Sequence, residues 1–313
     1  MLYKWYYFGI VNGNRRNHMA DRPTEAQHPS SHGLHAVPAE VALSRLLAAQ
    51  EAALQAVRPA LGAIEAAAEA AATTLRKGGR MGYAGAGSSG LMALADCLEL
   101  AGTFGIMPPQ TPMMFAGGAQ ALLHMTGAVE DDPALAQADF AAARIGAGDV
   151  VICVSASGTT PYTMEITRAA QAVGARVVGI ANVPGSPLLK AADIAVLLDT
   201  GPEVVAGSTR MGAGTAQKVA LNMLSVLVGI RLGHVHDGSM VNVIADNAKL
   251  ADRAARIVGT IAGVDRDAAV AALARAGGGV KPAILVAKGA DPEAARAALA
   301  ASGGHLGPAL LTF

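Results

Sequence analysis

Short apolar runs alternate with glycine- and serine-rich turns after Gly78, and this alternation constrains the fold more than any other feature. Each run is followed by a turn and then by a segment with helical spacing of apolar residues. Buried parallel strands joined by crossover helices give this texture, so the sequence predicts an α/β fold with a parallel sheet sandwiched by helices. The candidate strands are 81–84, 112–115, 150–154, 176–180 and 194–198, and helices are predicted near 90–100, 119–125, 163–173 and 213–231.

Other segments flank or close this alternating region. Residues 39–77 are rich in alanine and leucine at helical spacing, which predicts an N-terminal helix. The helix 213–231 is almost uncharged after Lys218, so we expect it to be buried in the core or at a subunit interface. We divide the chain into residues 1–35, an extension expected to be poorly ordered or to arise from translation that starts upstream of Met19; 36–240, the sheet domain; and 241–313, a small C-terminal helical unit.

The composition indicates a protein that handles small molecules. Hydrophobic residues make up 52% of the chain, and 24 basic residues balance 24 acidic ones. This balance gives no electrostatic case for nucleic acid or a membrane surface as a partner, and no uncharged apolar run is long enough to predict a membrane span. Cys97 and Cys153 lie in apolar stretches without metal-ligand spacing, so we expect no disulfide, no structural metal and a cytoplasmic location.

The first glycine-rich loop, GAGSSG at 85–90, follows a predicted strand and precedes a predicted helix. Ligands bind at the carboxyl ends of strands in α/β sheets, and a helix N-terminus favours an anion. Gly87, Ser88 and Ser89 are therefore candidate phosphate-binding residues. The G-x-G-x-x-G spacing also fits a dinucleotide fold, but TFG at 103–105 stands about where a ribose-binding acid is expected.

A second loop and a third polar stretch add further candidates. The loop SASGTTP at 155–161 also follows a strand and precedes a helix, and dinucleotide folds do not require it. Two such loops can surround one phosphate with main-chain N–H groups and hydroxyls, although helix capping is the alternative explanation. The candidates are Ser155, Ser157, Thr159 and Thr160 in the second loop, and Glu203, Ser208, Thr209 and Lys218 in the polar stretch before the long apolar helix.

Together these segments resemble the sugar isomerase (SIS) superfamily of phosphosugar-binding domains. Within it they are most similar to the N-acetylmuramic acid 6-phosphate etherase family, to which the glucokinase regulatory protein is related. The similarity runs from about residue 41 to the C-terminus. It is carried by GRMGYAGAGSSG, TFG, AGG, EDD, SASGTTPY and NVPGSPL, and then by GPEVVAGSTRMGAGTAQK, NMLS, MVNV and DNAKL, the last four of which plain isomerases lack.

The resemblance implies a reaction and two catalytic residues. The family cleaves the lactyl ether at C3 of N-acetylmuramate 6-phosphate by elimination and water addition, which gives N-acetylglucosamine 6-phosphate and D-lactate without a metal or cofactor. Its two functional glutamates fall on Glu99 and Glu130 of this chain. Leucines around Glu99 are expected to desolvate it and keep it protonated as the acid for the lactyl oxygen, which leaves Glu130 as the base at C2.

The spacing of Glu99 raises a geometric question. It lies ten residues after Ser89, which is roughly 15 Å along a helix and further than a hexose phosphate reaches. We therefore expect either a break in the helix before Glu99 or a site completed by a second subunit, and we expect a homodimer.

Several positions depart from the family pattern. Leu91 and Thr159 stand where the family usually has arginine, Ala101 and Gly102 replace prolines, and Asn242 replaces an aspartate. These losses could weaken anion binding or mark a different sugar phosphate. A phosphosugar-binding regulator without catalysis and an aldose–ketose isomerase therefore remain as alternative functions.

Overall fold

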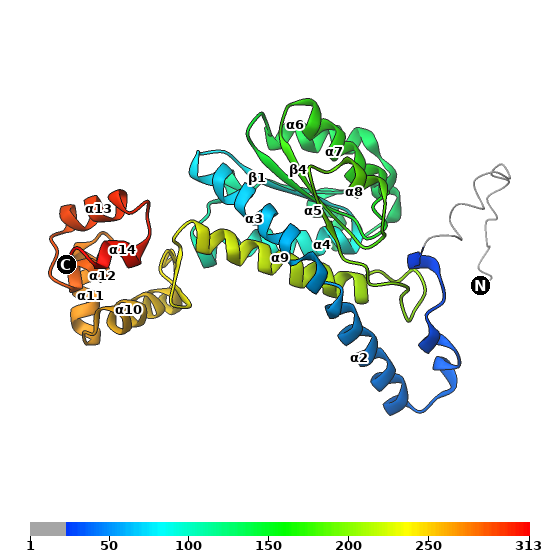
Figure 1. The fold of residues 1–313 in the computed structure, drawn as a ribbon, viewed down its shortest axis with the longest axis horizontal. Coiled ribbons are helices and arrows are strands. Elements are labelled where there is room, and N and C mark those ends of the chain that lie inside the picture. The colour runs from blue at the N-terminus through cyan, green and yellow to red at the C-terminus, as the bar shows by residue number, and fades with distance from the viewer. Residues whose placement is uncertain (1–22) are drawn as a thin grey trace, which may run out of the picture.

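The computed structural model describes residues 23–313 and contains a five-stranded parallel sheet (Figure 1). The strand order is β2-β1-β3-β4-β5. The strands are β1 (Met81–Gly85), β2 (Met113–Phe115), β3 (Val150–Val154), β4 (Arg176–Ala181) and β5 (Ile194–Leu197). All five predicted strands and the predicted α/β fold class are thus confirmed, with bounds that differ by one residue at most.

Helices cover both faces of the sheet, which explains why β1 and β3 are apolar and buried throughout. On one face lie α3 (Leu61–Arg76), α4 (Gly87–Phe104) and α9 (Gly212–Arg231). On the other lie α6 (Pro133–Ala143), α7 (Pro161–Ala172) and α8 (Pro187–Ala191), drawn in green in Figure 1.

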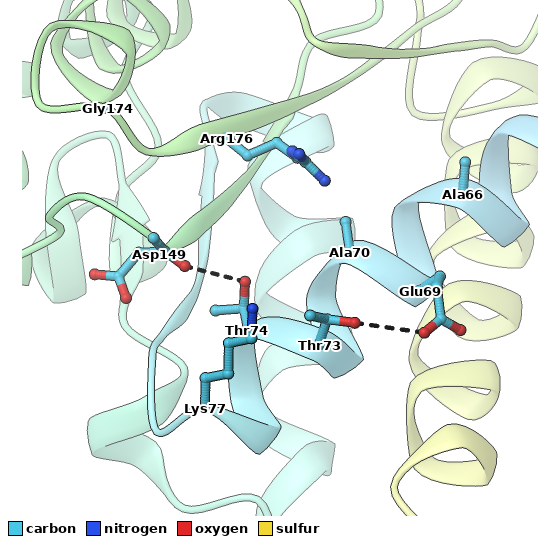
Figure 2. Close-up of a pocket in the computed structure, with 10 residues that line it drawn as sticks. Ala66, Glu69, Ala70, Thr73, Thr74, Lys77, Asp149, Gly174 and Arg176 are labelled. Atoms are coloured by element: carbon cyan, nitrogen blue, oxygen red, sulfur yellow. Dashed lines mark hydrogen bonds between the residues drawn. The ribbon is translucent and has the colours of Figure 1, made fainter.

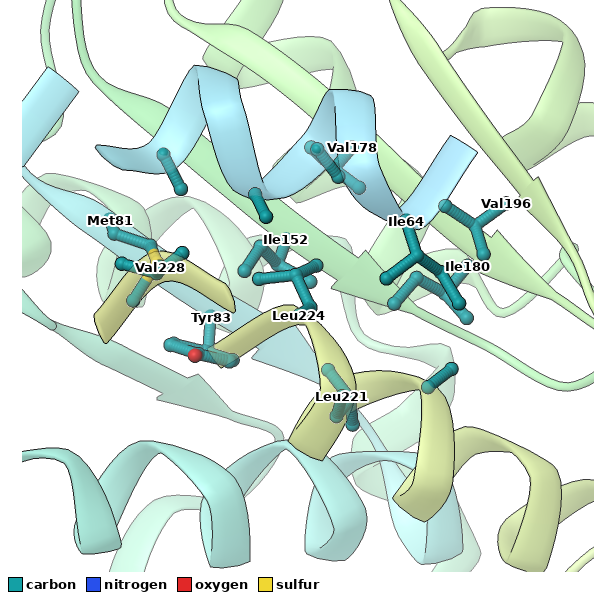
Figure 3. Packing of buried hydrophobic residues seen from close by; sticks show 14 of the residues in the cluster. Ile64, Met81, Tyr83, Ile152, Val178, Ile180, Val196, Leu221, Leu224 and Val228 are labelled. Carbon is teal, nitrogen blue, oxygen red and sulfur yellow. The ribbon is translucent and has the colours of Figure 1, made fainter. Parts of the chain in front are cut away.

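The larger core fills the space between the sheet and α3, α4 and α9. Figure 3 shows Leu221 and Leu224 of α9 packed towards Tyr83 of β1 and Ile152 of β3, while Ile64 of α3 lies over β4. All of these side chains except Ile64 are completely buried, and Ile64 is 3% exposed. The prediction that the long apolar helix is buried is therefore confirmed for the face of α9 that meets the sheet.

By length and composition alone α9 could cross a membrane, and α11 (Arg266–Arg275) with α12 (Val280–Ala287) would pass the same test as one bent span. Within α9, however, 56% of the apolar stretch is buried inside the protein. Its hydrophobicity is accounted for at least in part by its place in the core.

The strand order creates a switch point between β1 and β3. After β1 the chain moves outward to β2 and then returns to the other side of β1 to form β3. The connections that leave β1 and β3 therefore diverge to opposite faces of the sheet, α4 on one and α7 on the other. Such a divergence opens a crevice at the carboxyl ends of the two strands, where α/β proteins bind ligands.

The remaining helices lie outside the sheet layers. Figure 1 shows α2 (Ala39–Gln55) extending away from the sheet. A hairpin, β6 (Val235–His236) and β7 (Ser239–Met240), follows α9. Five helices then gather at one end of the molecule around their own apolar cluster (Figure 1): α10 (Ala248–Ala262), α11 (Arg266–Arg275), α12 (Val280–Ala287), α13 (Pro292–Ala301) and α14 (Leu306–Leu310).

Some expectations need correction. The predicted helix 39–77 is two helices, α2 and α3, separated by a 3₁₀ turn at Arg58–Ala60 in which Pro59 cannot donate a helical hydrogen bond. α5 (Gly118–Leu123) was expected, whereas α6 and α8 were not. Residues 1–22 of the expected extension lie outside the described residues, and residues 23–36 contain three 3₁₀ turns.

Candidate active site

The loop between β1 and α4 brings two backbone segments into close contact. A Cβ on Gly90 would lie 2.8 Å from the carbonyl carbon and oxygen of Gly85, so a side chain at position 90 would collide with the end of β1. α4 begins at Gly87, and no side chain caps its first N–H groups. These donors, together with the helix dipole, form a site that favours an anion.

Hydroxyl groups organise the second loop from within. The Ser155 hydroxyl is buried, accepts a hydrogen bond from the Gly158 N–H at 3.1 Å and lies 2.8 Å from the Thr160 hydroxyl. The Ser157 hydroxyl accepts from the N–H of Thr159 at 3.2 Å and from its hydroxyl at 3.0 Å. α7 then begins, again without a side-chain cap. The loop is thus held in one shape before any ligand arrives.

One hydrogen bond joins the two loops. The Ser89 hydroxyl, at the start of α4, accepts from the main-chain N–H of Ala156 in the second loop at 3.1 Å. Because β1 and β3 are neighbours and parallel, this contact places the N-termini of α4 and α7 beside the same space. Two sets of main-chain donors therefore converge on one position.

A cavity of about 720 Å³ opens at this position, and we call it the loop cavity. It brings together eight of the predicted site residues: Gly87, Ser88, Ser89, Glu130, Ser157, Thr159, Thr160 and Thr209. The remaining lining residues are Thr24, Glu25, Ala86, Met125, Asp131, Ala156, Pro161 and Gly207.

A second cavity, of about 490 Å³, lies at the amino ends of the strands, and Figure 2 shows the residues that line it. It is lined by residues before β3 and at the start of β4, with α3 as its other wall. Asp149 there accepts hydrogen bonds from the N–H groups of Arg80 at 2.7 Å and Gly146 at 2.9 Å. Its carboxylate therefore holds the loop, and the location at the amino ends of the strands is not where α/β sheets bind ligands.

Glu130 projects towards the first loop. It lies in a 3₁₀ turn, Gly127–Asp131, and its Oε1 would be only 2.5 Å from a Cβ on Gly87. Burial raises the pKa of Glu130, and the neighbouring charge of Asp131 raises it further. A carboxylate whose pKa is raised in this way binds protons more strongly, which suits a general base.

Glu99 lies elsewhere. α4 is one continuous helix from Gly87 to Phe104, so the helix break that the sequence analysis allowed before Glu99 is absent. Glu99 is exposed and does not line the loop cavity, and its neighbour Leu98 is 69% exposed. The leucines of this chain therefore do not desolvate Glu99 as expected, because they leave its carboxylate exposed.

Four other predicted binding residues also lie outside the cavity. Ser155 is buried within the second loop, and Ser208 lies between two residues of the cavity wall, Gly207 and Thr209. The buried Glu203 carboxylate accepts from the N–H groups of Gly212 and Ala213, both at 2.8 Å, and thus caps α9. The exposed Lys218 donates to the side chain of Asn222.

The N-terminal segment also contributes to the cavity, although no pattern in the sequence predicted this. Thr24 is buried, and its carbonyl accepts from the N–H of Gly207 at 3.0 Å, while Glu25 lies against the same glycine. These residues line the loop cavity. No local pattern marked them, because the segment has neither helical nor strand periodicity and acquires its position only by contact with residues 203–209.

The charges around the cavity are acidic. Among its lining residues Glu25, Glu130 and Asp131 carry carboxylates, and none of the described lining residues is lysine or arginine. A phosphate there would depend on main-chain N–H groups, helix dipoles and hydroxyls. Within residues 23–313 no group of three or more His, Cys, Asp or Glu side chains is arranged to hold a metal ion.

Comparisons with known proteins agree with this geometry. Residues 47–182 match the family model of the SIS domain. A phosphosugar isomerase candidate involved in capsule formation from Bacteroides fragilis has a TM-score of 0.50 at 22% identity over 63% of this chain and 92% of that one, which supports the fold.

Curated relatives extend the similarity beyond the SIS domain. The chain is 46% identical over 267 residues to the N-acetylmuramic acid 6-phosphate etherase of Deinococcus radiodurans, which covers 85% of this chain and 88% of the relative. It is 41% identical over 272 residues to that of Streptomyces coelicolor, which covers 87% of each. The resemblance found in the sequence is confirmed, and the chain belongs to the N-acetylmuramic acid 6-phosphate etherase family.

Proposed function

We propose that this protein is an N-acetylmuramic acid 6-phosphate etherase, a carbon–oxygen lyase that releases D-lactate and N-acetylglucosamine 6-phosphate. The observation that carries the proposal is the position of Glu130, whose carboxylate lies beside Gly87 in a cavity lined by the loops that follow β1 and β3. The products suit the recycling of peptidoglycan amino sugars. Two buried free cysteines, Cys97 and Cys153, are in keeping with the reducing cytoplasm.

The chemistry explains why two carboxylates are enough. In the open-chain sugar, C2 is α to the C1 aldehyde, so its proton is acidic, and the ether oxygen is on C3, the β carbon, from which it can leave. A base removes that proton, the electron pair forms the C2–C3 double bond, and the C3–O bond breaks as an acid protonates the lactyl oxygen. Water then adds its hydroxyl to C3 and a proton to C2. Glu130 is the proposed base and Glu99 the proposed acid.

The phosphate would position the sugar for this step. In the proposed mode, the N–H groups at the start of α4 and the hydroxyls of Ser88, Ser157 and Thr160 bind it, while Ser89 and Ser155 hold the loops together. Since no lysine or arginine is among the described residues that line the cavity, these donors carry the binding. The replacement of family arginines by Leu91 and Thr159 fits this arrangement.

We further propose that the functional unit is a homodimer and that Glu99 acts in the loop cavity of its partner. Glu99 and the loop cavity are separated along an unbroken helix by roughly 15 Å. Leu98, next to Glu99 on α4, is 69% exposed, and Met223, Val226 and Ile230 are exposed at helical spacing on α9, which packs against α4. A second copy that covers this stripe would bury Glu99 as its role as an acid requires.

Residues 36–240 would then form the phosphosugar-binding domain, and residues 241–313 would form an accessory helical unit. The helices α10–α14 support this division because they share an apolar cluster of their own.

A coupled D-lactate assay on the purified protein tests the activity. The proposal predicts lactate from N-acetylmuramate 6-phosphate. Binding of the substrate without release of lactate would favour the regulator, and isomerisation without release would favour the aldose–ketose isomerase.

Mixing two inactive variants tests the shared site. Glu99→Gln and Glu130→Gln should each be inactive alone. After random re-association only the hybrid dimers contain an intact site, one of their two, so the mixture should show about a quarter of the wild-type activity per mole of subunit. If the mixture stays inactive although mass spectrometry detects the hybrid dimer, each chain supplies both residues and the shared site is wrong.

A further inference from the structure

A buried carboxylate outside the loop cavity joins three elements. Asp96 of α4 is 4% exposed, and its Oδ2 accepts from the Tyr83 hydroxyl of β1 at 2.9 Å. Its Oδ1 accepts from the Asn222 amide and the Ser225 hydroxyl of α9, both at 2.8 Å. The proposed reaction uses none of these four residues, yet Asp96 lies one helical turn before Glu99.

The Asn222 side chain has two partners, and this fixes its orientation. Its amide nitrogen donates to Asp96, so its carbonyl oxygen faces away from Asp96 and accepts from the ammonium of Lys218, one turn earlier on α9. Asp96, Asn222 and Lys218 therefore form a chain of hydrogen bonds from the core to the surface. Lys218 is exposed, and the chain ties its ammonium to Asp96, one helical turn before Glu99 on α4.

Burial raises the pKa of Asp96, and the hydrogen bonds from Asn222, Ser225 and Tyr83 and the charge of Lys218 offset this rise only in part. The donors and the nearby ammonium thus favour the charged carboxylate. A charged Asp96 binds the Asn222 amide more strongly and also attracts the Lys218 ammonium. Both interactions stabilise the same arrangement of these three side chains.

We propose that Asp96 and Asn222 are positioning residues that hold the Lys218 ammonium where it binds the carboxylate of the substrate's lactyl group. This inference rests on the proposed function. The substrate has two anionic groups, and the loop cavity offers main-chain donors for the phosphate but no lysine or arginine among its described lining residues. The lactyl oxygen must meet Glu99, so the lactyl carboxylate lies near the α4–α9 surface that presents Lys218.

The product N-acetylglucosamine 6-phosphate lacks the lactyl group. Its binding therefore distinguishes the loss of the contact between Lys218 and the lactyl carboxylate from general damage to the site. For Asn222→Ala we expect the KM for N-acetylmuramate 6-phosphate to rise about tenfold, the effect of losing a charge-assisted contact, while the inhibition constant of the product stays within about twofold. Lys218→Ala should behave in the same way. The double variant should be no worse than Lys218→Ala, because both changes remove one interaction.

Ser225→Ala is the matched control. It also removes a 2.8 Å hydrogen bond to Asp96 Oδ1, but Ser225 does not contact Lys218. It should lower the melting temperature without changing KM. Asn222→Ser, which is too short to bridge both partners, serves as a second variant if Asn222→Ala does not fold.

Three outcomes would overturn the inference while leaving the etherase intact: equal effects on substrate and product, an Asn222→Ala effect that persists in the Lys218→Ala background, or a Ser225→Ala variant with the same raised KM. A wild-type protein that binds the substrate but releases no lactate would instead contradict the proposed function.

Discussion

Replacing Gly87 by alanine would test the position of Glu130 without altering its chemistry. Gly87 has a φ of +53°, in the left-handed region, where a side chain costs about 1–2 kcal/mol. The new Cβ would lie 2.5 Å from Glu130 Oε1, whereas ordinary contact begins at 3.4 Å. The carboxylate must therefore move by about 0.9 Å, and a displacement of about 1 Å at a reacting group can cost roughly 100-fold in rate.

We expect kcat for D-lactate release to fall roughly 100-fold in Gly87→Ala. The backbone strain should lower the melting temperature by roughly 2–8 °C, which follows from a loss of about 1–2 kcal/mol in a chain of this size. Steady-state kinetics and calorimetry would measure the two effects separately.

Gly118→Ala is the control for strain. Gly118 has a φ of +55° and also begins a helix, but no atom lies within 4 Å of the point that its new Cβ would occupy. It should lose similar stability and retain kcat. If the two variants are equally active, Glu130 does not act from the position beside Gly87 and the reasoning is refuted.

Two further predictions concern pH and stability. Because the Asp131 charge helps to raise the pKa of Glu130, Asp131→Asn should lower that pKa. The base must be unprotonated, so the acid limb of the pH profile of kcat/KM should move to lower pH; an unmoved limb would count against Glu130 as the titrating base. Glu203→Ala removes the buried cap of α9 and should lower the free energy of unfolding in urea by about 2–4 kcal/mol. A loss below about 0.5 kcal/mol would show that the cap is dispensable.

The sheet was predictable from the sequence because each strand is short, apolar and bounded by turn residues. Residues 150–154 are an example, since β3 matches the prediction at both ends. The strand order was not predictable, because local periodicity does not say on which side of β1 the chain returns. That order is what brings the loops after β1 and β3 together.

The candidate site was predictable where main-chain geometry follows from local sequence. Ser88, Ser157 and Thr160 belong to turns between strands and helices, and all three line the cavity. The capping contacts of Glu203 could not be predicted, because a capping carboxylate and a ligand-binding one look alike in a sequence until the N–H partners are known. Thr24 and Glu25 could not be found, because only their contact with a distant loop gives them a role.

Exchange of the C2 proton in deuterated water tests the central claim most directly, with N-acetylglucosamine 6-phosphate as the substrate and NMR as the readout. We expect wild type and Glu99→Gln to incorporate deuterium at C2. Glu99→Gln should release no D-lactate from N-acetylmuramate 6-phosphate, and Glu130→Gln should neither incorporate deuterium nor release D-lactate. Full exchange in Glu130→Gln would contradict the account, because another group would then be the base.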